Sequence, residues 1–459
     1  MPKGLRRALP WLAASAVLGS AIVVGRRRPA AVTSSGGSAR SAVFSASPGR
    51  RFYTGRSLDR AVTIADLRAM AHRHLPRFVL EYLEGGAEGE ATLARNAAVL
   101  EEWHFRHRSL VDVSRRDPST SVFGRTMAMP VAIAPTGLNG LFWPHADLCL
   151  AQAAAKAGIP FAQSTMSNDA LECVASVPGL RHWWQLYVFG PEEIRDGLMV
   201  RAEAAGCEAL IVTVDAQIYG NREWDRRTQS APGRLSASAM LDVLRHPRWL
   251  AAGPLRHGLP VFDNVIDFVP KGRRRFFDSA QWIRGEMDQA LSWRAIAAIR
   301  RRWSGKLIVK GLLDVADVAR AVEEGIDAVA ISNHGGRQLD CAVAPLDLLA
   351  QARAEVGDRI ILIADGAMRR GSDILKALAL GADMVFVGRA ALYGVAAAGE
   401  AGVSRALAIL REEITRDLGL LGAPALADIS ADLLEPRRAF PPRAVPDQAP
   451  SPPLRIRHG

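Results

Sequence analysis

Eight short apolar runs, most of them separated by alanine-rich stretches, constrain the fold of this chain more than any other feature. The helical stretches between them include residues 147–157, 191–205, 315–324 and 371–380. Short apolar runs suit strands that are buried on both faces of a parallel sheet. Eight strands alternating with helices predict an α/β protein with a (β/α)8 TIM barrel rather than an open sheet. The predicted strands cover residues 130–135, 159–162, 183–187, 209–214, 306–310, 328–332, 360–364 and 384–387.

One further segment precedes this strand–helix pattern and a second interrupts it. Residues 63–100 have helical periodicity with a break at Glu84-Gly85-Gly86, which predicts an N-terminal helical extension. Residues 215–305 separate the fourth and fifth predicted strands, whereas a βαβ unit needs roughly thirty residues. Within that long insert, the segment 216–284 carries twelve Lys/Arg against six acidic residues, together with several aromatic residues. Such a basic insert suits a membrane surface or a partner subunit, and a loop packed over the barrel mouth is the alternative.

The net charge of +11 is concentrated at the N-terminus. Residues 1–58 contain ten Lys/Arg and no acidic residue, so the remainder has 58 − 10 = 48 basic against 47 acidic residues. A protein that binds nucleic acid is expected to spread positive charge over its working face. We therefore predict no nucleic-acid partner.

Residues 8–25 form an 18-residue apolar run between arginines. At about 1.5 Å per residue a helix of this length could just span a bilayer. A secretion signal, an organellar transit peptide and a start codon placed too early are the other interpretations. We predict three units, namely a basic tail (1–58), a barrel domain (59–435) that contains the insert 216–284, and a disordered Pro/Arg-rich tail (436–459).

The four cysteines lie far apart and include no CxxC pair. This spacing argues against a zinc site and against a disulfide framework, so we predict no metal. The cysteines are expected to be reduced and mostly buried: Cys149, Cys173, Cys207 and Cys341.

Polar residues follow every predicted strand, at the end where TIM barrels place their functional side chains. After the sixth strand come His334, which could act as a general base near neutral pH, and Arg337, which could bind a carboxylate through two hydrogen bonds. Asp215, at the end of the fourth strand, is a suitable partner to orient His334. The other residues at strand ends include Thr136, Gly137, Ser164, Gln185, Tyr187, Thr213, Lys310 and Ser332.

The loops after the seventh and eighth strands suit a phosphate group. Asp365 and Gly366 begin the first loop and Arg369 follows, while Gly388 and Arg389 form the second. TIM barrels commonly bind phosphate at these two positions with backbone N–H groups and a helix N-terminus. Arginine side chains can add charge-assisted hydrogen bonds.

Together these motifs resemble the FMN-dependent 2-hydroxy-acid dehydrogenase/oxidase family over roughly residues 63–430. The most specific motif is Ser-Asn-His-Gly-Gly-Arg-Gln-Leu-Asp at 332–340. Supporting motifs lie at 81–87, 134–137, 185–187, 213–215, 309–311, 365–371 and 388–389. Within the family, segments 110–116, 246–249 and 338–341 are similar to the mandelate dehydrogenase branch, and lactate dehydrogenases are also similar.

The resemblance implies a role for each residue. His334 would remove a proton from the substrate, Asp215 would stabilise the protonated imidazole, and Lys310 would stabilise the anionic reduced flavin at its N1/C2 carbonyl edge. The substrate would be bound by Tyr82, Tyr187, Arg222 and Arg337, with Tyr187 also serving catalysis. FMN would be contacted by Pro135, Thr136, Gly137, Ser164, Gln185, Thr213, Lys310, Ser332, Asp365, Gly366, Arg369, Gly388 and Arg389.

The resemblance also implies an activity. The expected reaction oxidises a mandelate- or lactate-like L-2-hydroxy acid to the 2-oxo acid and passes electrons to a quinone-type acceptor. Gly137 replaces an alanine of the oxidases, and Met166 replaces a tryptophan of glycolate oxidase. An oxidase that uses oxygen and produces hydrogen peroxide is the alternative. We expect a homo-oligomer, by resemblance a tetramer, associated with the cytoplasmic side of a membrane, while organelle-targeted and soluble cytoplasmic forms are the alternatives.

Overall fold

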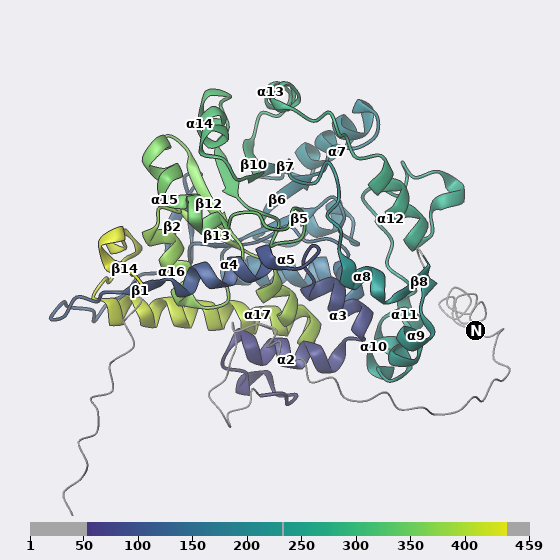
Figure 1. The fold of residues 1–459 in the computed structure, drawn as a ribbon, viewed down its shortest axis with the longest axis horizontal. Helices are drawn as coiled ribbons and strands as arrows, with labels where there is room; N and C mark the ends of the chain where they lie inside the picture. Colours follow the sequence, from purple (N-terminus) through teal and green to yellow (C-terminus); the bar gives the residue numbers. More distant parts are fainter. Residues whose placement is uncertain (1–52, 232–233, 438–459) are drawn as a thin grey trace, which may run out of the picture.

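The computed structural model describes residues 53–231 and 234–437, and its centre is a closed barrel of eight parallel strands (Figure 1). The predicted TIM barrel is therefore confirmed. The insert separates neighbouring strands β7 (Ala209–Thr213) and β10 (Lys306–Leu312), which still pair directly. Around the barrel the order is β10 (Lys306–Leu312), β11 (Ala328–Ile331), β12 (Ile361–Asp365), β13 (Met384–Val387), β4 (Val131–Ile133), β5 (Pro160–Ser164), β6 (Arg181–Leu186) and β7 (Ala209–Thr213).

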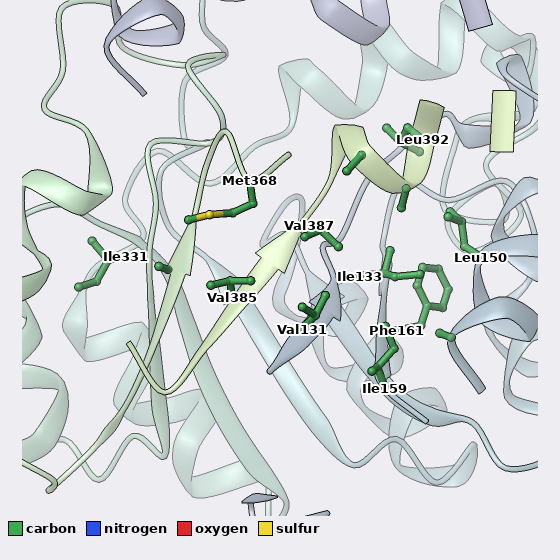
Figure 2. Close-up of a cluster of buried hydrophobic side chains, with 14 of the residues drawn as sticks. Val131, Ile133, Leu150, Ile159, Phe161, Ile331, Met368, Val385, Val387 and Leu392 are labelled. Carbon is green, nitrogen blue, oxygen red and sulfur yellow. The ribbon is translucent and has the colours of Figure 1, made fainter. Parts of the chain in front are cut away.

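Alternate side chains of the strands enter two different cores. Val131 and Ile133 of β4 point outward and pack in the layer between strands and helices (Figure 2), whereas Ala132 packs inside the barrel. The interior also contains Trp183 and Phe386, whose ring centroids lie 6.2 Å apart. Because both faces of each strand are buried, the strands appear in the sequence as continuous apolar runs.

Helices cover the outside of the barrel in the order that the sequence predicts. The last of them, α17, is kinked at Ala398 and Gly399, where the backbone leaves the helical region. The covering helices are α5 (Ala146–Ala157), α6 (Leu171–Ala175), α7 (Glu192–Ala204), α13 (Trp293–Arg302), α14 (Val315–Glu323), α15 (Pro345–Val356), α16 (Gly371–Ala379) and α17 (Arg389–Leu421).

The N-terminal extension consists of α2 (Ile64–His74), α3 (Arg77–Glu84) and α4 (Ala91–Glu101). Thr63 caps α2 in a capping box, because its hydroxyl accepts from the Asp66 N–H and its own N–H donates to the Asp66 carboxylate. α2 packs on α17 (Figure 1). The extension therefore continues the helical layer, and the Glu84-Gly85 turn between α3 and α4 lies beside the barrel mouth, where the Gly85 carbonyl accepts from Arg337.

Outside the insert, two small antiparallel sheets supplement the barrel. The hairpin of β2 (Thr120–Val122) and β3 (Arg125–Met127) packs its buried residues against the barrel interior. Arg181, at the start of β6, donates to the Val122 carbonyl, so this hairpin covers the N-terminal end of the barrel. The other sheet pairs β1 (Trp103–Phe105) with β14 (Leu434–Pro436). With the N-terminal end closed, the C-terminal end is left for the functional site.

The insert after β7 folds into short helices, of which α8 and α9 pack beside α3 (Figure 1). The indole N–H of Trp249 donates to the Leu141 carbonyl at 2.8 Å, and the Asn168 amide donates to the Val261 carbonyl at 2.9 Å, so the insert is attached to the barrel loops. It contains α8 (Glu223–Arg227), β8 (Gln229–Ala231), β9 (Arg234–Leu235), α9 (Ala237–Leu244), α10 (Pro247–Ala252), α11 (Pro254–His257) and α12 (Phe276–Gly285).

The expectation for the cysteines is wrong in one respect. All four are free, but only Cys207 is buried, Cys149 is half-buried, and Cys173 and Cys341 are exposed. Cys341 lies in the turn that follows the His334 loop, and Cys173 faces solvent on the short helix α6. Cys173 and Cys341 are exposed because of their places in the fold, which the spacing of cysteines in the sequence does not reveal.

The apolar run 8–25 and almost all of the two predicted tails lie outside the described residues. Among the residues that the structure describes, no helix has the length and apolar character needed to cross a bilayer. The same residues contain no group of three or more His, Cys, Asp or Glu side chains that could hold a metal ion.

Candidate active site

A cavity of about 290 Å³ lies at the C-terminal ends of the barrel strands. The predicted site residues line it, with the exception of Asp215, Gln185, Thr213 and Ser332. Each of these four is hydrogen-bonded to another predicted site residue, three of them directly to a residue of the wall. The predicted residues that line the cavity are Tyr82, Pro135, Thr136, Gly137, Ser164, Tyr187, Arg222, Lys310, His334, Arg337, Asp365, Gly366, Arg369, Gly388 and Arg389.

His334 lies between Asp215 and Tyr187. Its Nδ1 is 2.9 Å from Asp215 Oδ1, and its Nε2 is 3.4 Å from the Tyr187 hydroxyl. A carboxylate at Nδ1 favours the tautomer with the proton on Nδ1, which leaves a lone pair on Nε2. Burial raises the pKa of the Tyr187 hydroxyl well above its ordinary value, so this hydroxyl stays protonated and can donate to Nε2.

The backbone at His334 is held in the left-handed region, with φ at +58°. For a residue other than glycine this conformation costs about 1–3 kcal/mol and persists only where the surroundings fix it. Here the His334 N–H donates to Ser332 Oγ, and the next turn is closed by the Gly336 N–H, which donates to the Asn333 side chain. The strained turn therefore directs the imidazole toward Asp215 and the cavity.

Opposing effects set the charge of the His334–Asp215 pair. Burial lowers the pKa of His334 below its ordinary value, although Asp215 raises it in part. Burial alone would raise the pKa of Asp215, but the charges of His334 and Lys310 outweigh it and hold that pKa low. At neutral pH the pair is thus a neutral imidazole beside an ionised carboxylate, which is the state that a general base requires.

Gly311 allows Asp215 to approach this closely. Its φ is +112°, and a Cβ at this position would lie 2.7 Å from Asp215 Cγ. The register of the β10–β11 pair also shifts between Lys310 and Leu312. The glycine after the lysine is therefore required both by its backbone conformation and by the space that Asp215 occupies.

Lys310 is joined to Ser332 and Asp365 from the next two strands. Its Nζ donates to Ser332 Oγ at 3.0 Å and lies 3.4 Å from Asp365 Oδ2, and Ser332 Oγ donates to that same oxygen at 2.7 Å. Lys310 is 4% exposed, so its charge is compensated within the site. Its ammonium group has one further donor available to a ligand in the cavity.

A second chain of hydrogen bonds crosses β5, β6 and β7. Ser164 donates to the Gln185 side-chain oxygen at 2.8 Å, and the Gln185 amide donates to Thr213 at 3.0 Å. All three residues are buried. This chain orients the polar groups on the floor of the cavity.

Two arginines and an aromatic ring form another wall. The guanidinium carbons of Arg337 and Arg222 lie 5.0 Å and 6.0 Å from the centroid of the Tyr82 ring. Arg337 also donates to the Gly85 carbonyl at 2.7 Å. Burial and the charge of Arg222 lower the pKa of Arg337 to about 9. This part of the site is therefore short of negative charge and suited to an anionic ligand.

Asp225 lies beside Arg222 and was not among the predicted site residues. One carboxylate oxygen is 4.0 Å from the Arg222 guanidinium, and the other oxygen, like Arg222 Nε, is buried without a hydrogen-bond partner among the described residues. Asp225 lies on helix α8 of the insert, where no strand-end pattern could identify it.

Residues of both predicted phosphate loops line the cavity. Gly388 precedes the first residue of α17, so the helix N-terminus faces the cavity where phosphate was expected. The Arg389 guanidinium lines the cavity but donates to the carbonyls of Leu83 and Gly335, among others. Burial lowers the pKa of Arg389 to about 10, with the charge of Arg369 as the next cause. Two arginines that repel each other at the cavity wall again indicate a place for an anion.

The residues present fit FMN. Thr136 Oγ1 lines the cavity and is buried without a hydrogen-bond partner among the described residues, as expected for a group that meets a ligand. Lys310 and the Ser164–Gln185 pair offer polar groups to a flavin ring, and the loops at Gly366 and Gly388 offer backbone N–H groups to a phosphate. The cavity wall is otherwise mainly apolar.

Five further residues of the insert, none of them among the predicted site residues, also line the cavity. The position of these residues supports the interpretation that the insert packs over the barrel mouth. They are Tyr219, Phe262, Ala280, Ile283 and Arg284.

Comparisons with known proteins show the family of the chain. The family model for FMN-dependent dehydrogenases matches residues 71–436. The chain is 43% identical to (S)-mandelate dehydrogenase of Pseudomonas putida over 81% of this chain and 93% of that protein. It is 38% identical to an L-lactate dehydrogenase of Pectobacterium atrosepticum over 80% of this chain and 95% of that protein.

Solved structures give the same result. The crystal structure of the monotopic membrane protein (S)-mandelate dehydrogenase matches with a TM-score of 0.78 at 43% identity, covering 82% of this chain and 99% of that one. A mandelate oxidase structure matches with a TM-score of 0.69 at 34% identity over 82% and 98%. The chain therefore belongs to the FMN-dependent dehydrogenase family, as an enzyme that acts on CH–OH donors with FMN as its cofactor.

Proposed function

We propose that this enzyme oxidises an L-2-hydroxy acid, mandelate- or lactate-like, to the corresponding 2-oxo acid and passes the electrons to a quinone-type acceptor. The single observation that carries the proposal is that His334, oriented by Asp215, faces the same cavity as Arg222 and Arg337. A base and a pair of cations in one cavity suit a substrate that has both a proton to lose and a carboxylate to bind.

Each residue has a defined task in this proposal. Arg222 and Arg337 bind the carboxylate and so fix the carbon that carries the hydroxyl near His334. His334 Nε2 takes a proton from the substrate, and Asp215 stabilises the imidazolium that results. Tyr82 and Tyr187 donate or accept hydrogen bonds at the substrate oxygens. FMN, when bound, would supply the acceptor for the two electrons and the second proton that the substrate loses.

Lys310 holds positive charge at the floor of the cavity. It is buried and already bonded to Ser332 and close to Asp365, so it cannot move away when negative charge develops beside it. A preorganised cation of this kind stabilises the transition state without the cost of reorientation. We propose Ser164, Gln185, Thr213, Gly366, Arg369, Gly388, Arg389 and the Pro135–Thr136–Gly137 loop as further FMN contacts.

The side chain of the substrate would meet a mainly apolar wall that includes Met166, Phe142 and residues of the insert. Such a wall favours an aromatic substrate, in keeping with a relative named (S)-mandelate dehydrogenase. A lactate-like substrate would leave part of this wall without contact.

Association with a membrane surface is a further part of the proposal. Leu241 and Leu244, on helix α9 of the insert, are 52% and 58% exposed, and Arg245 follows them. Exposed leucines beside basic residues suit an anionic bilayer surface. We propose peripheral attachment on the cytoplasmic side, with organelle-targeted and soluble cytoplasmic forms as alternatives, and a homotetramer.

An oxidase that reduces oxygen to hydrogen peroxide is the second candidate, because a mandelate oxidase is also similar in structure. Gly137 argues against the oxidase. It lines the cavity at a position where, by the family resemblance, oxidases have alanine. A Cβ at this position would lie 2.8 Å from Met166 Cβ, so the wall as built accommodates only glycine here.

One experiment tests the function and a second separates the two candidates. Purified enzyme is mixed anaerobically with a panel of 2-hydroxy acids that includes mandelate, lactate and glycolate, and the flavin absorbance is followed. Bleaching by an L-2-hydroxy acid is expected, and failure of the whole panel would refute the proposal. The bleached enzyme is then mixed with air, where return of absorbance within milliseconds would favour the oxidase.

A further inference from the structure

The cavity contains one more arginine than the proposed function uses. Arg369 and Arg389 lie in the phosphate loops, and Arg222 and Arg337 lie beside Tyr82. These four account for two anions, the FMN phosphate and the substrate carboxylate. Arg284, near the end of α12 in the insert, lines the same cavity and has no task in the reaction.

Arg284 combines a place in the cavity wall with the lack of an acidic partner among the described residues. Its guanidinium carbon lies 5.3 Å from the centroid of the Tyr219 ring, and no ion pair is formed by it among the described residues. By contrast, Arg227 and Arg274 pair with acidic side chains. Arg284 is exposed, so its charge faces solvent as well as the cavity.

The wall next to Arg284 concentrates the effect of its charge. Ile283 and Phe262 are buried apolar residues, and Ala280 adds no polar group. Apolar walls have a low dielectric constant, and a cleft of one charge sign with such walls raises the local concentration of an oppositely charged ligand. The Tyr219 ring holds the guanidinium at the cavity edge through a cation–π contact.

We propose that Arg284 is the entrance residue of the substrate cavity. It attracts the carboxylate of an incoming 2-hydroxy acid and passes it to Arg222 and Arg337, which line the same cavity and are less exposed than Arg284. The inference rests on the proposed function, because only an anionic substrate gains from an unpaired cation at the entrance. Arg284 raises the rate at which substrate and enzyme associate, and it takes no part in proton or electron transfer.

This role predicts a specific kinetic pattern. Removing the charge lowers the second-order rate constant of flavin reduction but leaves the limiting rate at saturating substrate unchanged. Added salt screens a solvent-exposed charge, so the difference between variant and wild type is largest at low ionic strength. A residue that only supports the fold would change the limiting rate or the flavin content instead.

The test compares holoenzymes of wild type, Arg284→Gln and Arg256→Gln by anaerobic stopped-flow reduction with mandelate and with lactate, at low and high ionic strength. Arg256 is an exposed arginine on α11 of the same insert that does not line the cavity, so its variant has the same change of charge. We expect Arg284→Gln to lower the second-order constant by about three- to tenfold at low salt, with a weaker salt dependence. Arg284→Lys should retain most of the wild-type constant.

A binding measurement supplies a readout that is independent of turnover. Oxalate has a carboxylate but no oxidisable carbon, and its association with the holoenzyme is followed through the flavin absorbance. Arg284→Gln should slow association, and Tyr219→Ala should do the same because the guanidinium loses its ring contact. Tyr219→Phe keeps the ring and should behave as wild type.

Equal association and reduction constants in Arg284→Gln and wild type would overturn the inference. So would an equal loss in Arg256→Gln, because the effect would then come from net charge alone. If no 2-hydroxy acid bleaches the wild-type flavin, the proposed function fails, and the oxalate measurement still decides the role of Arg284.

Discussion

His334 Nδ1 lies 2.9 Å from Asp215 Oδ1, although 119 residues separate the two in the chain. The contact joins the loop after β11 to the end of β7, across the intervening strand β10. It depends on Gly311 in β10, because any Cβ there would overlap Asp215. The result is an imidazole whose Nδ1 is occupied and whose Nε2 faces the cavity.

Replacing His334 with alanine should leave FMN bound and remove most of the turnover. A positioned general base contributes about 10²- to 10⁴-fold, and a loss in kcat of this size is expected. Flavin absorbance per protein gives the cofactor content, and anaerobic reduction gives the rate. His257→Ala removes an imidazole from the insert outside the cavity and is the matched control; near-normal turnover in His334→Ala would contradict the role as base.

Replacing Asp215 with asparagine should change the pH dependence. His334 must be neutral to accept a proton, and burial holds its pKa below the ordinary value, so wild-type kcat/KM should stay high below pH 6.5 and fall only as the pH passes the lowered pKa. Asp215 raises that pKa, so Asp215→Asn should move the acid limb to still lower pH while kcat decreases.

Asp225→Asn is the control for that pH profile, because it removes a carboxylate beside Arg222 and not beside His334. It should raise KM and leave the acid limb in place. An acid limb that moves to higher pH in Asp215→Asn would show that Asp215 does not stabilise the imidazolium.

Replacing Lys310 with methionine should both destabilise the protein and stop flavin reduction. The substitution leaves Asp365 without its cation in a buried site, and breaking such a pair costs about 3–5 kcal/mol. Thermal unfolding should show a lower Tm. The double variant Lys310→Met/Asp365→Asn should recover most of the stability and none of the reduction rate, whereas recovery of both would assign Lys310 a purely structural role.

Replacing Arg337 with methionine should weaken substrate binding. Truncating one member of a buried charge pair costs about 2 kcal/mol or more, which corresponds to roughly thirtyfold in Kd. Arg337→Lys should not restore binding, because a guanidinium can donate to the Gly85 carbonyl and still present a second N–H to a carboxylate. Titration with oxalate measures the affinity, and an unchanged Kd in Arg337→Met would exclude this residue from the carboxylate site.

The barrel and most of the cavity could be predicted from the sequence because buried parallel strands have a simple signature and their ends meet at one face. Lys310 and Asp365 lie near the C-terminal ends of their strands and His334 comes shortly after β11, so their convergence follows from topology. Asp225 and Arg284 could not be predicted because they lie on helices of the insert, whose packing follows no repeating rule.

The insert also limits how its proposed membrane contact can be tested. Deleting 216–284 would remove Arg222, Tyr219 and Arg284 from the cavity, so a loss of activity would not report on the membrane. Point substitutions on α9 avoid this problem, because Leu241 and Leu244 face solvent and do not line the cavity.

Replacing Leu241 and Leu244 with asparagine should therefore release the enzyme from anionic lipid vesicles and leave its activity with a soluble electron acceptor unchanged. Each leucine that enters the bilayer contributes about 1.5–3 kcal/mol, so the pair should change the partition coefficient by more than a hundredfold. Leu420→Asn, at a residue that is 67% exposed on α17, is the matched control. Vesicle sedimentation measures the partition. If the double variant still sediments and only removal of residues 1–58 releases it, the anchor is the N-terminal tail, because the same apolar transfer energy would then come from the run at 8–25.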